Sequence, residues 1–110
     1  MANYNRKAII ESLKRERVEA ENKCEVVDGV DVYEILLSLF QSDKTDEEII
    51  NRMEEENKKK NIWAMEFDRR AIMNEEAGDE EGEQEERMRV DNQFRQSWII
   101  EDYLAKIVTV

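Results

Sequence analysis

The side chains of this chain that could do chemistry are mostly carboxylates, because the sequence holds 28 Asp and Glu residues, one cysteine and no histidine. Without an imidazole there is no Ser-His or Cys-His nucleophile pair and no histidine general base. The single cysteine, Cys24, cannot build a zinc or iron-sulfur site, which takes several thiolate or imidazole ligands. Carboxylate pairs need apolar surroundings to act as acid and base, and these acids stand among other charges. We therefore predict no catalytic residue, no cofactor and no metal, and expect that the chain is not an enzyme.

Phosphate-binding and calcium-binding loops are excluded by the glycines. Only Gly29, Gly78 and Gly82 are present, and their spacing matches neither the dinucleotide fingerprint nor the P-loop. If any of them stood at the sixth position of a calcium loop, the first position would lack an oxygen ligand. No nucleotide or calcium site is predicted.

The densest group of carboxylates lies in residues 75–86, with eight acids, no base, two glycines and no large apolar side chain. This composition is typical of disorder, so we predict an acidic flexible loop before the last helix. In a helix the acids would stand about 2.2 Å apart along the axis, close to the roughly 1.7 Å per charge of duplex DNA, whereas an extended chain gives about 5 Å. The glycines favour the extended form, so we expect general attraction to basic surfaces. The candidate partner-binding acids are Glu75, Glu76, Asp79, Glu80, Glu81, Glu83, Glu85 and Glu86.

The charge of the chain indicates what kind of partner it would attract. Seventeen Lys and Arg stand against 28 Asp and Glu, a formal net charge of −11. Residues 1–24 hold six bases and four acids, a net charge of +2, so the rest of the chain carries −13. Such a surface repels nucleic acid and anionic membranes and attracts basic proteins. No apolar run is long enough for a membrane span or a signal region, so we expect a cytoplasmic protein.

These observations favour an acidic protein-interaction module that binds a basic partner protein, most simply one that handles nucleic acid. Inhibition of that partner, as exerted by small acidic phage and viral proteins, belongs to the same hypothesis. The alternative is a structural or assembly role, as a chaperone, scaffold or subunit with a helical homo-oligomer interface. A homodimer is therefore a further expectation. Direct binding of nucleic acid through Arg6, Lys7, Lys14, Arg15 and Arg17 is disfavoured, because these bases alternate with acids and spread over more than one helix face.

The element that must organise the fold is the densely apolar window from Val30 to Phe40. Asp31 and Glu34 have the spacing of a capping box that would start a helix there. Five large side chains then recur at helical spacing and form one apolar stripe. These residues are Val32, Ile35, Leu36, Leu39 and Phe40.

The remaining elements are also predicted to be helices, because the chain has no proline and is rich in helix formers. We predict a mostly α fold, a small bundle of about four helices forming a single domain over residues 1–110. Asn3 or Asn5 would cap the first helix, and Thr45 with Glu48 forms a second capping box. Residues 25–30 are expected to form a turn, with a small hairpin as the alternative. Residues 46–74 form one helix or two, and residues 88–110 contain the last.

Aromatic residues occur among both the predicted core and the predicted partner anchors, and Trp98 belongs to both. Trp63, Phe67 and Ala71 form a ridge at i, i+4 and i+8, which is either core or an exposed binding ridge. Aromatic side chains often anchor interfaces, so Trp63, Phe67 and Trp98 are the candidate anchors. The predicted core comprises Ile9, Leu13, Val32, Ile35, Leu36, Leu39, Phe40, Ile49, Met53, Phe94, Trp98 and Leu104.

Overall fold

The chain folds into helices joined by short connections, as a computed structural model that describes residues 5–22 and 32–108 shows. The helices are α1 (Arg6–Asn22), α2 (Val32–Gln41), α3 (Asp46–Glu76) and α4 (Glu80–Val108), and no strand occurs among the described residues. The prediction of a mostly α bundle of four helices is confirmed. The predicted turn at 25–30, the cap at Asp31 and Cys24 lie outside the described residues.

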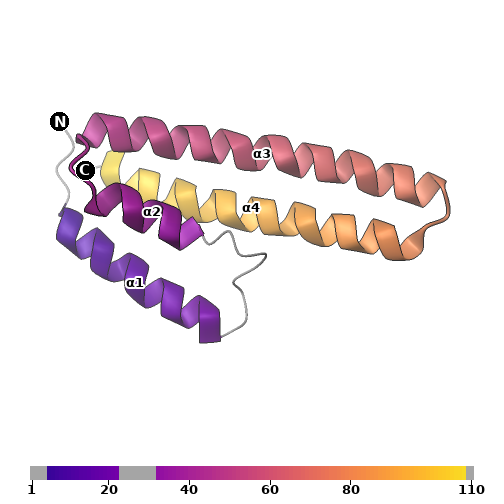
Figure 1. The fold of residues 1–110 in the computed structure, drawn as a ribbon, viewed down its shortest axis with the longest axis horizontal. Helices are drawn as coiled ribbons and strands as arrows, with labels where there is room; N and C mark the ends of the chain where they lie inside the picture. Colours follow the sequence, from indigo (N-terminus) through magenta and orange to yellow (C-terminus); the bar gives the residue numbers. More distant parts are fainter. Residues whose placement is uncertain (1–4, 23–31, 109–110) are drawn as a thin grey trace.

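Two of the helices are much longer than the others and determine the shape of the molecule. Helices α3 and α4 pack side by side as an antiparallel hairpin, while α1 and α2 pack at one end of it (Figure 1). The molecule measures 52 × 28 × 21 Å, with a radius of gyration of 16.1 Å. A compact chain of this length would have about 13 Å. We call the four-helix end the base, and residues 60–98 of the hairpin, which extend beyond it, the arm.

Helix starts follow the capping signals in the sequence. The Asn5 side-chain oxygen accepts a hydrogen bond from the Ala8 amide at 3.3 Å. Thr45 and Glu48 form the predicted capping box, in which Thr45 Oγ1 accepts from the Glu48 amide at 3.2 Å and Glu48 Oε1 accepts from the Thr45 amide at 3.4 Å. Helix α3 then continues unbroken for 31 residues, so residues 46–74 belong to one helix. No described helix has the combination of length and apolar character that a membrane crossing requires.

The base is closed by a contact between the start of α1 and the α2–α3 connection. The Arg6 guanidinium donates to the carbonyls of Ser42 at 3.2 Å and Lys44 at 3.1 Å, and pairs with Asp46 Oδ1 at 2.7 Å. Because Asp46 is the first residue of α3, this arginine links the start of α1 to the start of the long hairpin.

The predicted flexible loop at 75–86 is wrong, because helices cover all of it except residues 77–79. Gly78 has a φ of 77°, which lets the chain reverse at this point. Asp79 Oδ1 then accepts a hydrogen bond from the Gly82 amide at 3.0 Å and caps α4. Glutamate is a good helix former, and acids in the first turn are stabilised by the helix dipole. These effects outweigh the composition that suggested disorder.

Most of the predicted core is confirmed, and the errors lie in α4. Ile9, Leu13, Val32, Leu36, Leu39, Phe40, Ile49 and Met53 are buried, and Ile35 and Leu104 pack partly buried against them. Phe94 and Trp98 were predicted wrongly, because they are 38% and 64% exposed. Helix α4 instead turns Ile100, Tyr103 and Ile107 towards the core, and the face that carries Phe94 and Trp98 lies outside it.

Candidate interaction surface

The interior of the arm is polar, which is unusual for a helical hairpin. Only two helices are present there, so a buried side chain must lie between them. Ala64 and Ala71 are fully buried, but Lys60, Glu86 and Ser97 are also at least nine-tenths buried. Burial lowers the pKa of the Lys60 ammonium, against the opposing effect of Glu56. The arm therefore has no large apolar core of its own.

Hydrogen bonds hold the part of this interior that lies nearest the base. Ser97 Oγ donates to Asn57 Oδ1 at 2.5 Å, and Asn57 Nδ2 donates to Glu101 Oε1 at 3.3 Å. Asn61 Nδ2 donates to the Asn57 carbonyl at 2.9 Å. A set of polar contacts thus links α3 to α4 where an ordinary hairpin would have leucines.

Other polar atoms inside the arm have no hydrogen-bond partner among the described residues. These are Glu86 Oε2, Gln93 Oε1 and Gln96 Oε1. Glu86 does bind Arg89 through its other oxygen, at 2.6 Å. An unsatisfied buried polar atom costs about 1 to 3 kcal/mol, so the contact between the two helices of the arm is weak for its length.

Large apolar side chains lie on the outside of the arm. Eight of the nine exposed large apolar residues of the described chain belong to it. Polar residues inside and apolar residues outside invert the usual order of a helical hairpin, which makes this surface the candidate for contact with another molecule. The eight residues are Ile62, Trp63, Met65, Ile72, Met73, Met88, Phe94 and Trp98.

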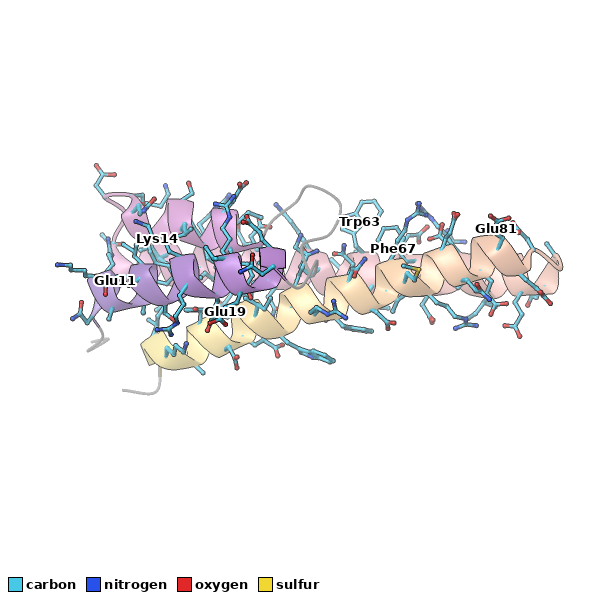
Figure 2. The ribbon with its side chains drawn as sticks, turned by 90° about the horizontal axis from the view of Figure 1, so that it is seen from below. Glu11, Lys14, Glu19, Trp63, Phe67 and Glu81 are labelled. Atoms are coloured by element: carbon cyan, nitrogen blue, oxygen red, sulfur yellow. The ribbon has the colours of Figure 1, made fainter. Side chains whose placement is uncertain are left out.

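Trp63 and Phe67 form a stacked pair on one side of the arm. Their ring centroids lie 5.5 Å apart with an angle of 29° between the planes. The guanidinium of Arg70 lies 6.0 Å from the Trp63 centroid and 5.5 Å from that of Phe67, and Arg89 of α4 lies 6.0 Å from Phe67. Figure 2 shows both rings on the upper side of the arm, with Glu81 on the same side nearer the tip. Trp63 remains 48% exposed, so the pair is available for contact.

The predicted acids gather at the tip, where α3 ends and α4 begins. Three of the eight are in ion pairs within the arm: Glu75 and Glu83 bind Arg87 at 3.4 and 2.8 Å, and Glu86 binds Arg89. The other five are exposed and extend from the end of the hairpin. They are Glu76, Asp79, Glu80, Glu81 and Glu85.

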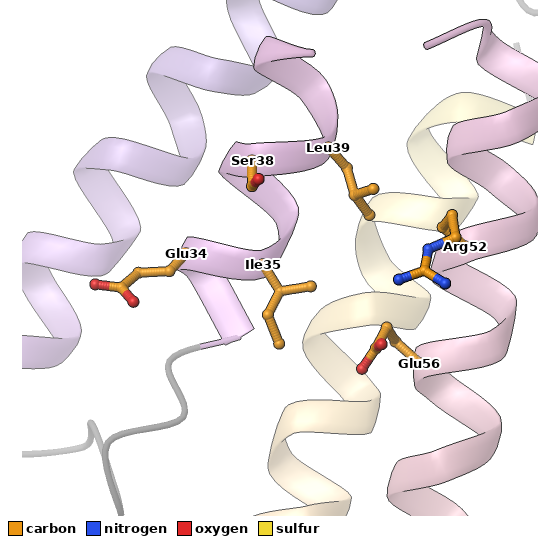
Figure 3. Close-up of a pocket in the computed structure, with 6 residues that line it drawn as sticks. All are labelled: Glu34, Ile35, Ser38, Leu39, Arg52 and Glu56. Atoms are coloured by element: carbon orange, nitrogen blue, oxygen red, sulfur yellow. The ribbon is translucent and has the colours of Figure 1, made fainter.

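A recess lies between α2 and α3 (Figure 3). Ile35 and Leu39 supply its apolar lining, and the polar Ser38 also lines it. Its charged residues already have partners: Glu34 binds Arg17 at 2.5 Å, Arg52 binds Glu55 at 3.2 Å, and Glu56 binds Lys59 at 3.3 Å. The recess therefore presents no unsatisfied charge to a ligand.

Two of the basic residues that could contact nucleic acid form ion pairs within the chain. Arg6 closes the base, and Arg17 binds Glu21 and Glu34. In residues 5–22 and 32–108, no three acidic, cysteine or histidine side chains are grouped so that they could hold a metal ion.

The structure brings the predicted site residues together in two groups. Trp63 and Phe67 form one group, and the eight acids form the other. Trp98 lies on α4, outside the Trp63–Phe67 pair. Ala71 does not share the exposed surface of Trp63 as the predicted ridge required, since Ala71 is fully buried.

Sequence reasoning missed Arg70 and Arg89 at the aromatic pair and the exposed residues Ile62, Met65, Ile72 and Met73. The spacing of Ile62, Met65 and Ile72 by three and seven residues could have revealed a helical stripe. No known protein family, curated protein or solved structure matches this chain.

Proposed function

We propose that this chain is an acidic interaction module that uses the tip of its arm to bind a basic partner protein, most simply one that handles nucleic acid. The observation that carries the proposal is the placement of eight carboxylates at the end of a projecting hairpin. Inhibition follows if the tip occupies the surface where the partner binds nucleic acid.

The spacing of the acids supports this proposal. Residues 80–86 are helical and contain five carboxylates, which is about 2 Å of helix axis per charge, near the roughly 1.7 Å of duplex DNA. Because helices and not a flexible loop carry these acids, less conformational entropy is lost on binding. Ion pairs with Arg87 and Arg89 reduce the charge of Glu83 and Glu86, so Glu80, Glu81 and Glu85 are the strongest candidates.

The Trp63–Phe67 pair would slow dissociation of the partner, an effect that charge alone does not provide. Long-range attraction mainly raises association rates, whereas aromatic side chains that become buried slow dissociation. Trp63 lies thirteen residues before Glu76 on the same helix, so about 20 Å separates the pair from the tip. A partner surface of ordinary size could cover both.

The proposal is tested by replacing Glu76, Glu80, Glu81 and Glu85 with Gln. A matched control replaces Glu11, Glu19, Glu54 and Asp102 with their amides, which changes the net charge equally at exposed positions away from the tip. Figure 2 shows Glu11 and Glu19 on α1, far from Glu81. A basic partner is first isolated by affinity capture at low and high salt, and its binding rates are then measured by stopped flow.

We expect the tip variant to associate at least several-fold more slowly at low salt than either the control or the unaltered chain. Its association rate should also depend less on salt between about 50 and about 500 mM, since screening has fewer charges to act on. Trp63→Ala should mainly raise the dissociation rate. Equal effects of the tip and control variants would show that net charge, and not the tip, determines binding.

The exposed apolar residues favour a second function, an assembly role through contacts between copies of the chain. Light scattering at tens of micromolar tests this role directly. A monomer mass at that concentration would exclude the assembly role. The binding of a basic partner would then remain as the explanation for the exposed residues of the arm.

A further inference from the structure

We propose that two copies of the chain pair through the outer edge of α3, with the two helices antiparallel. The surface is a stripe of six residues in α3, which we call the edge stripe: Lys58, Ile62, Met65, Arg69, Ile72 and Glu76. This inference rests on the assembly role named above and deepens it, because it assigns the contact to one surface of α3. Of the acids at the tip, only Glu76 belongs to this surface.

The edge stripe has the periodicity of a coiled-coil seam. Its residues are separated by four, three, four, three and four positions. This is the heptad alternation of four and three, which keeps residues on one face of a helix that pairs with another. All six residues are exposed. Met65 is 72% exposed, the highest value among the exposed large apolar residues. Intramolecular packing therefore does not explain the pattern.

The edge stripe also lies where a second helix can reach it. Ala64 and Ala71, which face α4, are fully buried, and Ile62 of the edge stripe stands about half a turn away from both. Figure 1 shows α3 along one edge of the molecule, with the other helices all on its opposite side. A helix from outside could lie along this edge over several turns.

The sequence of the edge stripe favours a second copy of the chain as the source of the helix that packs there. The spacing reads the same from both ends, as a two-fold interface requires. In the antiparallel register Lys58 meets Glu76 of the other copy, Ile62 meets Ile72, and Met65 meets Arg69. Each contact therefore joins opposite charges, two isoleucines, or a methionine and the aliphatic stem of an arginine.

Parallel pairing would lose this complementarity. It would place Lys58 beside Lys58, Glu76 beside Glu76 and Arg69 beside Arg69, and like charges in contact destabilise an interface. The edge stripe itself carries two bases and one acid, so it has no special attraction for a basic protein.

The centre of the edge stripe is stabilised within each copy. Arg69 donates two hydrogen bonds to Glu66, at 2.6 and 3.1 Å, and Arg70 donates to the same carboxylate at 3.3 Å. Glu66 therefore neutralises part of the positive charge that two Arg69 residues would otherwise bring to the middle of the dimer. The aliphatic part of Arg69 stays available for packing.

The dimer is tested by sedimentation equilibrium of the full chain. We expect a reversible dimer at tens of micromolar, and an increase of about tenfold or more in its dissociation constant for Ile72→Lys or Met65→Lys. Met88→Lys is the matched control, because it places the same charge at an exposed methionine of α4 outside the edge stripe. Lys58→Glu and Glu76→Lys should each weaken the dimer, and the two changes combined should restore it.

The orientation is tested by spin-label distances in a Cys24→Ser background. In the antiparallel register, labels at Asp68 of the two copies should lie about 3 Å apart along the helix axis, and labels at Glu55 about 36 Å apart. Parallel helices would give similar distances at both positions. A monomer at all concentrations, a dimer unaffected by Ile72→Lys, or equal distances at the two positions would overturn the proposal. None of these outcomes bears on the binding of a basic protein by Glu80, Glu81 and Glu85, which lie outside the edge stripe.

Discussion

The hydroxyl of Tyr103 donates a hydrogen bond of 2.6 Å to Glu16 Oε2, and so joins the last helix to the first across 87 residues of sequence. Ser12 Oγ lies 3.0 Å from the same hydroxyl. The Tyr103 side chain is buried in the core that α1, α2, α3 and α4 share. Burial, and secondly the hydrogen bond to Glu16, raise the pKa of the Tyr103 hydroxyl well above its usual value.

This raised pKa predicts a loss of stability in alkali. The unfolded chain releases the tyrosine proton near its ordinary pKa of about 10, while the folded chain retains it, so the contribution of Tyr103 is complete below about pH 10 and is lost progressively above it. Tyr103→Phe should flatten the fall in the free energy of unfolding above pH 10. It should also lower stability at pH 7 by about 1 to 3 kcal/mol, since Glu16 loses its donor. Denaturant titrations at several pH values measure both effects, and an unchanged alkaline slope would contradict the assignment.

Leu36→Ala tests the organising helix. Leu36 is fully buried in the base, so its truncation should lower the free energy of unfolding by about 2 to 5 kcal/mol. Ser38→Ala, at an exposed position of the same helix, should change it by less than about 0.5 kcal/mol. Chemical denaturation followed by circular dichroism provides the measurement. Similar small losses in both variants would mean that α2 contributes little to the core.

Gln93→Leu and Gln96→Leu should each stabilise the chain. Both side chains bury an oxygen without a partner, and replacing an unsatisfied polar group by an apolar one of similar size removes a cost of about 1 to 3 kcal/mol. Ser97→Ala should have the opposite effect, because Ser97 donates to Asn57. Thermal unfolding of the three variants distinguishes these cases. A loss of stability in both leucine variants would show that the two amides are satisfied in solution.

Gly78→Ala tests the turn between the long helices. No atom lies within 4 Å of an added Cβ, so the expected cost of about 1 to 2 kcal/mol is conformational and comes from the positive φ. Gly78→Asn is the control, because asparagine tolerates this backbone region better than alanine and should cost less. Equal costs for the two variants, measured by denaturant unfolding, would mean that the turn relaxes to another conformation.

The sequence predicted the base better than the arm, and the reason is physical. In α2 the apolar residues are dense, so a single stripe decides which face is buried. Helix α4 carries large side chains on more than one face, and Phe94 and Trp98 have the same spacing as core residues. Periodicity alone could not show that α1 and α2 cover only one end of the hairpin, where Ile100 and Tyr103 lie.

The prediction of a flexible loop at residues 75–86 was wrong for a different reason. Composition favoured disorder, whereas local interactions favour helix: the Asp79 cap, the turn at Gly78, and ion pairs such as Glu83 with Arg87. Each is small, and composition rules do not count them. The eight candidate acids still lie together at the tip, because a run of charges remains a group in any conformation.

The exposure of both tryptophans determines what their fluorescence can report. Trp63 and Trp98 lie on the outer surface of the arm, and the aromatic residues of the buried core are Phe40 and Tyr103. Indole emission should therefore change little when the base unfolds, but should shift to shorter wavelength when a partner covers the arm and removes water from the rings. Trp98→Phe leaves Trp63 as the sole indole beside Phe67 and Arg70, so a titration of that variant would reveal whether a ligand reaches this side of the hairpin.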